Sequence, residues 1–438
     1  MRSHSLNCDT DNLFDDPDVE ESIQTKAPKL PSKKRDRVLD CEADGDLFDE
    51  YKTLSQTDRV NDVINLLPIC YVGNKKRVLR PIWHFLEAKH VEFNSVFDAF
   101  SGSGVFSFMS LLMNKSVTMN DVMSYPSLLA VSLLGNKSYC PTNKQLQVIM
   151  GEDLCPTNNI HIADQWEGLF FTKEECDFLN RFRSNLVTMY GHTVYAGHKL
   201  DGTPKLISLI PGKEPESSIG MLNNAFFLYL LLTLLHQLCF TGGRYFRRQI
   251  IAKLDYRLQH IRNKGAEIHA RPMDFMWLKE VRKFLDILST KVDEGDSYHE
   301  FISEDIIDVL SSNQSPSADL LYLDPPYGGM SSNYLEIYRL FEEYIYGVPT
   351  AAIPHLAVPG NRFKSAKGYR EQFEEVLSLC GDYPSWLISY NAQSFSSVEE
   401  ITKSIKRFRN RVDIMDTDIK YRYRKGTGKS NEFTILAR

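Results

Sequence analysis

The segment Asp324-Pro325-Pro326-Tyr327 gathers a carboxylate, backbone carbonyls and an aromatic ring in one short turn. It directly follows the apolar run Leu320–Leu323, which predicts a buried strand. Two successive prolines fix φ and remove two N–H donors, so the turn is rigid. Open α/β sheets bind ligands at the carboxyl ends of their strands, where this turn would lie. Acceptors beside a stacking surface suit an amino group on a planar base; the alternative is an ordinary proline turn at a strand end.

A glycine loop supplies a second candidate site. In Asp98-Ala-Phe-Ser-Gly-Ser-Gly104, the glycines follow the apolar run Ser95–Phe100 and precede the apolar stretch Val105–Met113. This order predicts a strand, a tight turn and a helix whose first N–H groups can face a ligand. The third glycine of a dinucleotide fingerprint is missing, which argues against a nicotinamide site. Asp121 ends the next predicted strand, where a carboxylate can accept hydrogen bonds from a ribose diol.

Short apolar runs that alternate with helical stretches position these candidates. We expect strands at 95–100, 116–121, 319–324 and 385–390, because continuous apolar runs are typical of parallel strands buried on both faces. The pattern at 419–437 predicts a C-terminal β-hairpin. The sequence therefore predicts an α/β fold with a mostly parallel sheet and helices on both faces.

The distribution of charge divides the chain of 438 residues into parts. Residues 1–50 carry a net charge of −7, against −6 for the whole chain, and a tail at 1–55 is expected to be disordered. Residues 160–300 are mainly helical in pattern, with a capping box at Thr172-Lys-Glu-Glu175, and their segment 241–291 carries a net charge of +7. We expect a catalytic domain at 56–160 and 301–438, interrupted by this basic helical insertion.

Composition argues against several classes of protein. The longest apolar run, 225–240, contains His236 and Gln237 and falls short of the ~20 residues that a membrane span needs, so no membrane partner is expected. Eight cysteines without a C-x-x-C pair give no zinc pattern, and no metal is expected. His236 itself is expected to be a buried core histidine.

Three motifs in a fixed order resemble a known family. Tyr71-Val-Gly-Asn-Lys75, the glycine loop and Asp324–Tyr327, with a long insertion before the last, resemble the alpha-group (Dam-type) DNA adenine-N6 methyltransferases. The resemblance covers about residues 65–437 in outline, is specific at the three motifs and is loose in the insertion. It implies a Rossmann-like methyltransferase fold with a target-recognition insertion, S-adenosyl-L-methionine as cofactor and double-stranded DNA as substrate.

The resemblance also implies a role for each motif residue. Lys75 would reach the methionine carboxylate of the cofactor, and Asp121 would hold its ribose hydroxyls. Asp324 and Pro325 would accept hydrogen bonds from the target adenine, and Tyr327 would stack on it. The implied catalytic residues are Asp324, Pro325, Pro326 and Tyr327. The implied cofactor contacts are Tyr71, Lys75, Asp98, Phe100, Gly102, Gly104, Asp121, Asp305 and Asp324.

The basic insertion is the candidate DNA-binding region. Its segment 241–248 mixes glycine, aromatic and arginine residues, which suits phosphate and base contacts, although a solvated helix face would carry the same charges. Nucleic-acid contacts are expected at Arg244, Tyr245, Arg247, Arg248 and Lys425. The stretch 425–430 looks like a phosphate loop, but Tyr423 occupies its first glycine position, so a hairpin turn near DNA phosphates is favoured.

The resemblance implies direct methyl transfer to an adenine that has left the duplex, without a covalent enzyme intermediate. It further implies a cytoplasmic protein in a prokaryotic cytosol or nucleoid, with a cognate restriction endonuclease as partner. Three alternatives stay open at this point: methylation of RNA adenine, methylation of cytosine N4 in DNA, and a catalytically silent DNA-binding protein on the same fold.

Overall fold

The computed structural model describes residues 64, 71, 73–134, 142–151, 154, 161–239, 282, 299–326, 334–353, 366–391, 394, 396–421 and 430–438. All of them belong to one compact unit, Gln56–Arg438. The predicted tail at 1–55, most of the basic segment 241–291 and the stretch 422–429 lie outside the described residues.

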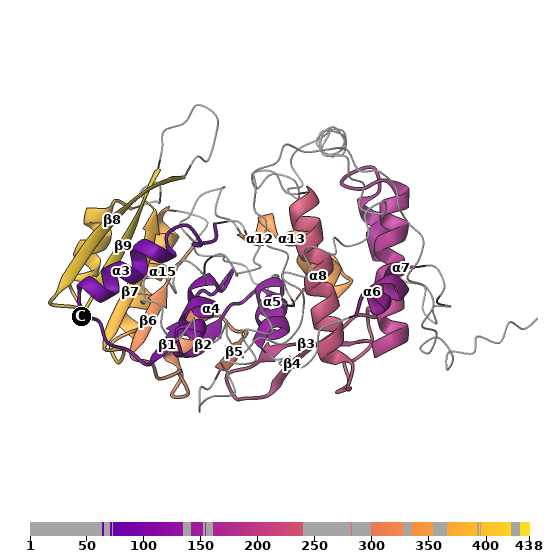
Figure 1. Ribbon diagram of the computed structural model, residues 1–438, viewed down its shortest axis with the longest axis horizontal. Coiled ribbons are helices and arrows are strands. Elements are labelled where there is room, and N and C mark those ends of the chain that lie inside the picture. Colours follow the sequence, from indigo (N-terminus) through magenta and orange to yellow (C-terminus); the bar gives the residue numbers. More distant parts are fainter. Residues whose placement is uncertain are drawn as a thin grey trace, which may run out of the picture. The chain divides into compact units, whose positions relative to one another are not determined.

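One sheet of nine strands organises the described part of the chain, in the order β4-β3-β5-β2-β1-β6-β7-β9-β8. Its parallel centre consists of β5 (His299–Ile302), β2 (Ser116–Asn120), β1 (Ser95–Asp98), β6 (Leu320–Leu323) and β7 (Ser385–Asn391). The strands β8 (Val412–Tyr421) and β9 (Ser430–Ala437) form an antiparallel hairpin, and β9 also pairs with β7 at one end of the sheet (Figure 1). The predicted α/β architecture, a Rossmann-like methyltransferase fold with a C-terminal hairpin, is confirmed.

The strand order reverses direction at β1. From β1 the chain proceeds through β2 to β5 on one side, whereas β6 and β7 lie on the other side. Such a switch point is where open α/β sheets bind ligands, beyond the carboxyl ends of the strands. In the parallel pairing of β1 with β6, Asp98 lies opposite Tyr322. The glycine loop and the Asp324 turn therefore follow two adjacent strands at the switch point.

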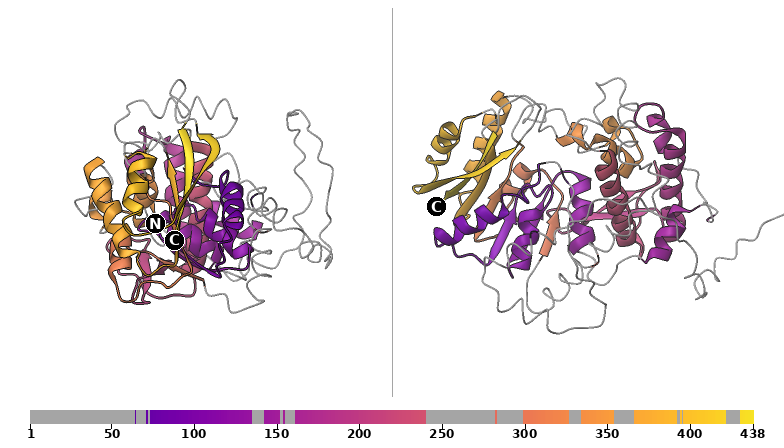
Figure 2. Two further views of the ribbon diagram at one scale, coloured as in Figure 1. Left: turned by 90° about the vertical axis from the view of Figure 1, so that its left-hand side faces the viewer. Right: turned by 45° about the horizontal axis from the view of Figure 1, so that its top comes forward.

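Successive side chains of the central strands enter two different cores. In β1, Val96 faces one apolar cluster and Phe97 the other. The helices α3 (Leu79–Ala88), α4 (Val105–Leu112) and α5 (Ser124–Leu134) cover the first face. The helices α11 (Ile306–Ser311), α15 (Ala366–Leu379) and α16 (Val398–Ile405) cover the second, and Figure 2 shows helices on both sides of the strands. Burial on both faces explains why these strands read as continuous apolar runs.

The described part of the 160–300 block joins the same sheet and core. The helix α7 (Lys173–Tyr190) begins with the predicted capping box, in which Thr172 and Glu175 bond each other's backbone N–H groups. The antiparallel hairpin of β3 (Thr193–His198) and β4 (Pro204–Ser208) extends the sheet beyond β5, and this hairpin was not expected from the sequence. The apolar helix α8 (Met221–Cys239) packs against α5 and β3.

Shorter elements complete the described fold. They are α6 (Asn143–Met150), α12 (Tyr334–Ile337), α13 (Arg339–Tyr346) and the 3-10 helices η1 (Ile162–Trp166) and η2 (Thr350–Ala352). Within the part of the chain that the structure describes, no helix has the length and apolarity that crossing a membrane requires.

Candidate functional site

The carboxylate of Asp121 ties the glycine loop to the start of α5. The Gly102 N–H donates to one Asp121 oxygen and the Met123 N–H to the other, each over 2.9 Å. Burial raises the pKa of Asp121 to about 6, although the two N–H bonds oppose this rise. The structure therefore brings the predicted Gly102 and Asp121 into direct contact, at the carboxyl ends of two neighbouring strands.

The backbone of the loop requires glycine at its end. Gly104 has a φ of +64°, a conformation that residues with a side chain rarely adopt. A Cβ atom there would lie 2.6 Å from Met119 Cε and 2.8 Å from Phe108 Cε2, so space is also lacking. A Cβ at Gly102 would lie 3.3 Å from Tyr71 Cε1, because the ring of Tyr71 covers the loop.

The Asp98 carboxylate, at the end of β1, has an unsatisfied oxygen. Its Oδ2 accepts a 2.6 Å hydrogen bond from Ser107, whereas its buried Oδ1 has no hydrogen-bond partner among the residues the structure describes. Burial raises the pKa of Asp98 to about 8; the Ser107 bond opposes this rise, and the nearby Asp324 adds to it. A buried acceptor that lacks a donor suits a ligand that brings one, especially a cation.

Lys75 lies between two carboxylates. Its Nζ is 2.5 Å from Glu432 Oε1 and 3.3 Å from Asp324 Oδ1. Burial disfavours the charged ammonium, but Asp324 and Glu432 more than offset this effect, so the pKa of Lys75 lies well above its ordinary value. Lys75 therefore contacts the Asp324 turn, a contact that the resemblance did not imply. Pro325 is buried, Pro326 is half-buried, and Tyr327 lies outside the described residues.

Glu432 is a buried acid that sequence reasoning missed. It lies in β9, is fully buried, and accepts hydrogen bonds from Ser389 over 3.0 Å and from Asn391 Nδ2 over 3.1 Å. One signal could have found it: Glu432 is the only acid in the otherwise apolar strand pattern of 432–437. A buried carboxylate in a strand needs a cation and donors, and here Lys75 and β7 supply them.

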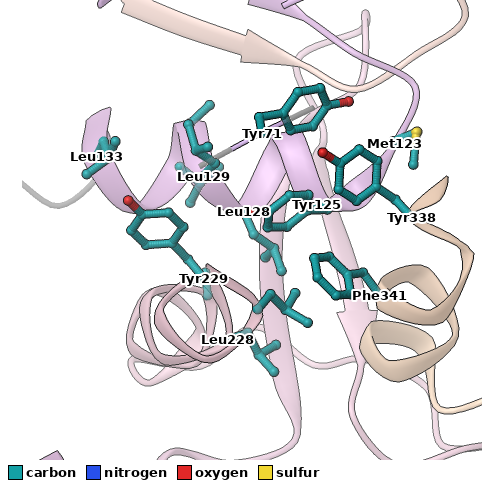
Figure 3. Packing of buried hydrophobic residues seen from close by; sticks show 14 of the residues in the cluster. Tyr71, Met123, Tyr125, Leu128, Leu129, Leu133, Leu228, Tyr229, Tyr338 and Phe341 are labelled. Carbon is teal, nitrogen blue, oxygen red and sulfur yellow. The ribbon is translucent and has the colours of Figure 1, made fainter. Parts of the chain in front are cut away.

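Stacked tyrosine rings hold Tyr71 over the loop. The Tyr71 and Tyr338 ring centroids are 4.6 Å apart, and Tyr125 and Tyr334 also stack on Tyr71 at 6.0 and 5.8 Å. Figure 3 shows Tyr71, Tyr125 and Tyr338 packed together above Phe341. The rings come from α5, α12 and the residue before α13, so elements on both sides of the insertion fix this part of the site.

Two other polar side chains that sequence reasoning missed connect the loops at this edge. Asn120, at the end of β2, donates to the Ala99 carbonyl over 3.2 Å and accepts from the Glu304 N–H over 3.3 Å. Lys205, from β4, donates to the Ser303 hydroxyl over 2.7 Å. The insertion thereby places a half-buried lysine beside the carboxyl end of β5.

The remaining predicted residues lie at the same edge or outside the described chain. Phe100 is half-buried against the second apolar cluster. Asp305 is exposed three residues after β5 and caps α11 by accepting from the Ile307 N–H. The predicted nucleic-acid contacts Arg244, Tyr245, Arg247, Arg248 and Lys425 lie outside the described residues.

Two further observations concern His236 and possible metal sites. His236 is buried beside Tyr338, and burial lowers its pKa to about 3, so it is the neutral core histidine that the sequence predicted. Where the chain is described, no cluster of three or more His, Cys, Asp or Glu side chains could hold a metal ion.

The chain is similar to a known methyltransferase along most of its length. It is 26% identical over 364 residues to the type II methyltransferase M2.HphI of Haemophilus parahaemolyticus, a match that covers 83% of this chain and 93% of that protein. No family model matches the chain. This similarity and the fold together support a methyltransferase.

Proposed function

We propose that the chain is a DNA methyltransferase that transfers a methyl group from S-adenosyl-L-methionine to N6 of adenine at specific sites, as the cytoplasmic modification enzyme of a restriction system. The observation that carries this proposal is the position of two motifs. The glycine loop and the Asp-Pro-Pro turn follow adjacent parallel strands at the switch point of the sheet. Similarity to a type II methyltransferase supports the reaction class.

The residues present fit the proposed cofactor. Asp98 offers a buried oxygen without a donor, which suits the ammonium of the methionine part. Asp121, directly after β2, has carboxylate lone pairs beyond those used by its two N–H bonds, which suits the ribose hydroxyls. When bound, the cofactor supplies a methyl group that the positive sulfonium already activates.

The Asp324 turn is suited to receive the amino group of a base. The Asp324 side chain is 19% exposed, and the Lys75 ammonium favours its ionised form, which only accepts hydrogen bonds. The lone pair of an exocyclic amine is delocalised into the ring, and acceptors at Asp324 and Pro325 favour the more tetrahedral nitrogen that attacks. The adenine reaches this turn after leaving the base stack.

Methyl transfer from labelled cofactor to duplex DNA tests the proposal. We expect N6-methyladenine as the methylated nucleoside, and we expect Asp324→Ala to slow transfer by roughly 100-fold or more while cofactor binding in calorimetry persists. Asp319→Asn, at the amino end of the same strand, is the matched control and should keep the rate.

Each alternative has its own result. N4-methylcytosine, or label in RNA alone, would identify a different acceptor. DNA binding without any binding of cofactor would identify a silent protein. Undiminished transfer by Asp324→Ala would refute the role of the Asp-Pro-Pro turn.

A further inference from the structure

We propose that Glu432 is a positioning residue, which acts through Lys75 to hold the Asp324 carboxylate in place and to keep the net charge of these three side chains negative beside the attacking amino group. This inference rests on the proposed function, since it assigns Asp324 to the target base. It adds a strand at the C-terminal end of the fold to a site otherwise built from the motif segments.

Glu432 is fixed to the sheet from several directions. It lies opposite Asn391 in the antiparallel register of β7 and β9. Its Oε1 accepts from Ser389 over 3.0 Å, and its Oε2 accepts from Asn391 over 3.1 Å. Because both donors belong to β7, the neighbour of β6, the position of this carboxylate is tied to the strand that carries Asp324.

Lys75 transmits this position to Asp324. An ammonium has three donors on one nitrogen and can bond two carboxylates together. The contact with Glu432 is the shorter, at 2.5 Å against 3.3 Å for Asp324, so Lys75 is anchored on Glu432 and reaches Asp324 from there. Lys75 and Glu432 are both buried, so water screens their interaction little.

The charge of the set explains why one lysine has two acids. The set of three side chains, Lys75, Asp324 and Glu432, carries one positive and two negative charges when all are ionised. With Lys75 alone, Asp324 would belong to a neutral pair and its oxygens would be weaker acceptors. With Glu432 present, the set keeps a net charge of −1. When the amino nitrogen bonds the methyl carbon, the carbon–sulfur bond of the donor breaks and its electron pair stays on sulfur. The nitrogen carries positive charge until it releases one proton to water, and a fixed negative set nearby stabilises that charge.

The test compares two isosteric variants of buried glutamates. Glu432→Gln removes the charge and keeps the shape, and Glu343→Gln does the same at a buried acid that pairs with Arg339 in α13. We expect the single-turnover rate on duplex DNA to fall by roughly 10- to 100-fold in Glu432→Gln, with cofactor affinity within about threefold of the wild type. Glu343→Gln should keep the rate, and Glu432→Asp, which retains the charge, should recover part of it.

A double variant tests whether Glu432 acts through Lys75. Lys75→Met should lower the rate, and Lys75→Met combined with Glu432→Gln should be no slower than Lys75→Met alone. A crystal structure of Glu432→Gln gives a readout without turnover: Lys75 Nζ should lie closer to Asp324 than the present 3.3 Å.

The outcomes separate the two proposals. A wild-type chain that methylates no nucleic acid would refute the proposed function together with this inference. An active wild type with an unchanged rate in Glu432→Gln would overturn the inference alone. The inference would also be overturned if the rate losses of Lys75→Met and Glu432→Gln multiplied in the double variant, or if Glu343→Gln lost as much rate as Glu432→Gln. An unchanged position of Lys75 in the crystal structure of Glu432→Gln would overturn it as well.

Discussion

Replacing Asp98 by asparagine should remove the pH dependence of stability that this residue imposes. Asp98 is buried at the end of β1 with one oxygen that lacks a donor among the described residues. Its ionised form is therefore disfavoured in the folded chain without ligand. Asparagine has the same shape and is neutral at every pH, so Asp98→Asn removes the titration and leaves the packing against Ser107 in place.

The sign of the effect follows from the two pKa values. An unfolded aspartate loses its proton near pH 3.8, whereas burial raises the pKa of Asp98 to about 8 in the folded chain. Between these values only the folded chain holds the proton, so the free energy of unfolding falls by about 1.4 kcal/mol for each pH unit. The contribution of Asp98 to the free energy of unfolding is complete below pH 3.8 and is lost by pH 8, a total of roughly 6 kcal/mol. Water entry around the charge makes this an upper limit.

The stabilities of the wild type and Asp98→Asn should cross as the pH rises. The new amide N–H of the variant has no acceptor where Oδ1 was, which costs about 1–3 kcal/mol at every pH. The variant should therefore be less stable than the wild type at pH 4 and more stable by about 3 kcal/mol at pH 8, or roughly 3 °C in Tm for a unit of this size. Thermal unfolding of the two proteins without cofactor, in matched buffers from pH 4 to 8, measures the difference.

The comparison isolates Asp98 because Asp121, whose pKa is also raised, titrates in both proteins. The same variant should bind S-adenosyl-L-methionine roughly 10- to 100-fold more weakly, since a bond between two charged groups is lost. Parallel curves of Tm against pH for the two proteins would refute the reasoning, because they would show that Asp98 does not resist ionisation in the folded chain.

Two further substitutions test the packing around the site. Gly104→Ala should lower the free energy of unfolding by about 2–4 kcal/mol, against about 1 kcal/mol for Gly202→Ala, because both have positive φ but only the former meets Met119; equal losses in urea unfolding would contradict this. Arg183→Met should cost about 3–5 kcal/mol, since it leaves three buried backbone carbonyls without their donor. The exposed Arg370→Met should cost less than about 1 kcal/mol in the same assay, and a comparable loss there would contradict the account of Arg183.

Features with a local cause were predictable from the sequence. The central strands are apolar throughout because both faces are buried, and their boundaries fall close to those expected. Gly104 is required by its own φ and by the side chains that contact it, so this position can be recognised in the sequence as part of a glycine motif. The capping box at Thr172 likewise depends on residues three positions apart.

Features that depend on distant partners were not predictable. The pairing of Lys75 with Glu432 joins positions 357 residues apart, and the sequence around either residue does not indicate its partner. The cofactor contact that the resemblance implies for Lys75 stays a prediction, whereas its contacts with Asp324 and Glu432 could not be foreseen from the sequence. The β3–β4 hairpin was missed because both strands are short and β4, the edge strand, is only partly buried, so that its apolar pattern is weak.

The position of Glu432 near the end of the chain has a consequence for biosynthesis. The glycine loop, Lys75 and Asp324 all leave the ribosome before β9, and the interval between Asp324 and Glu432 is on the order of 5–20 s at ordinary rates of translation. If Glu432 acts as proposed, a nascent chain that already carries every recognisable motif is still incompetent. Methylation of DNA would then have to wait until β9 has been synthesised and has joined the sheet.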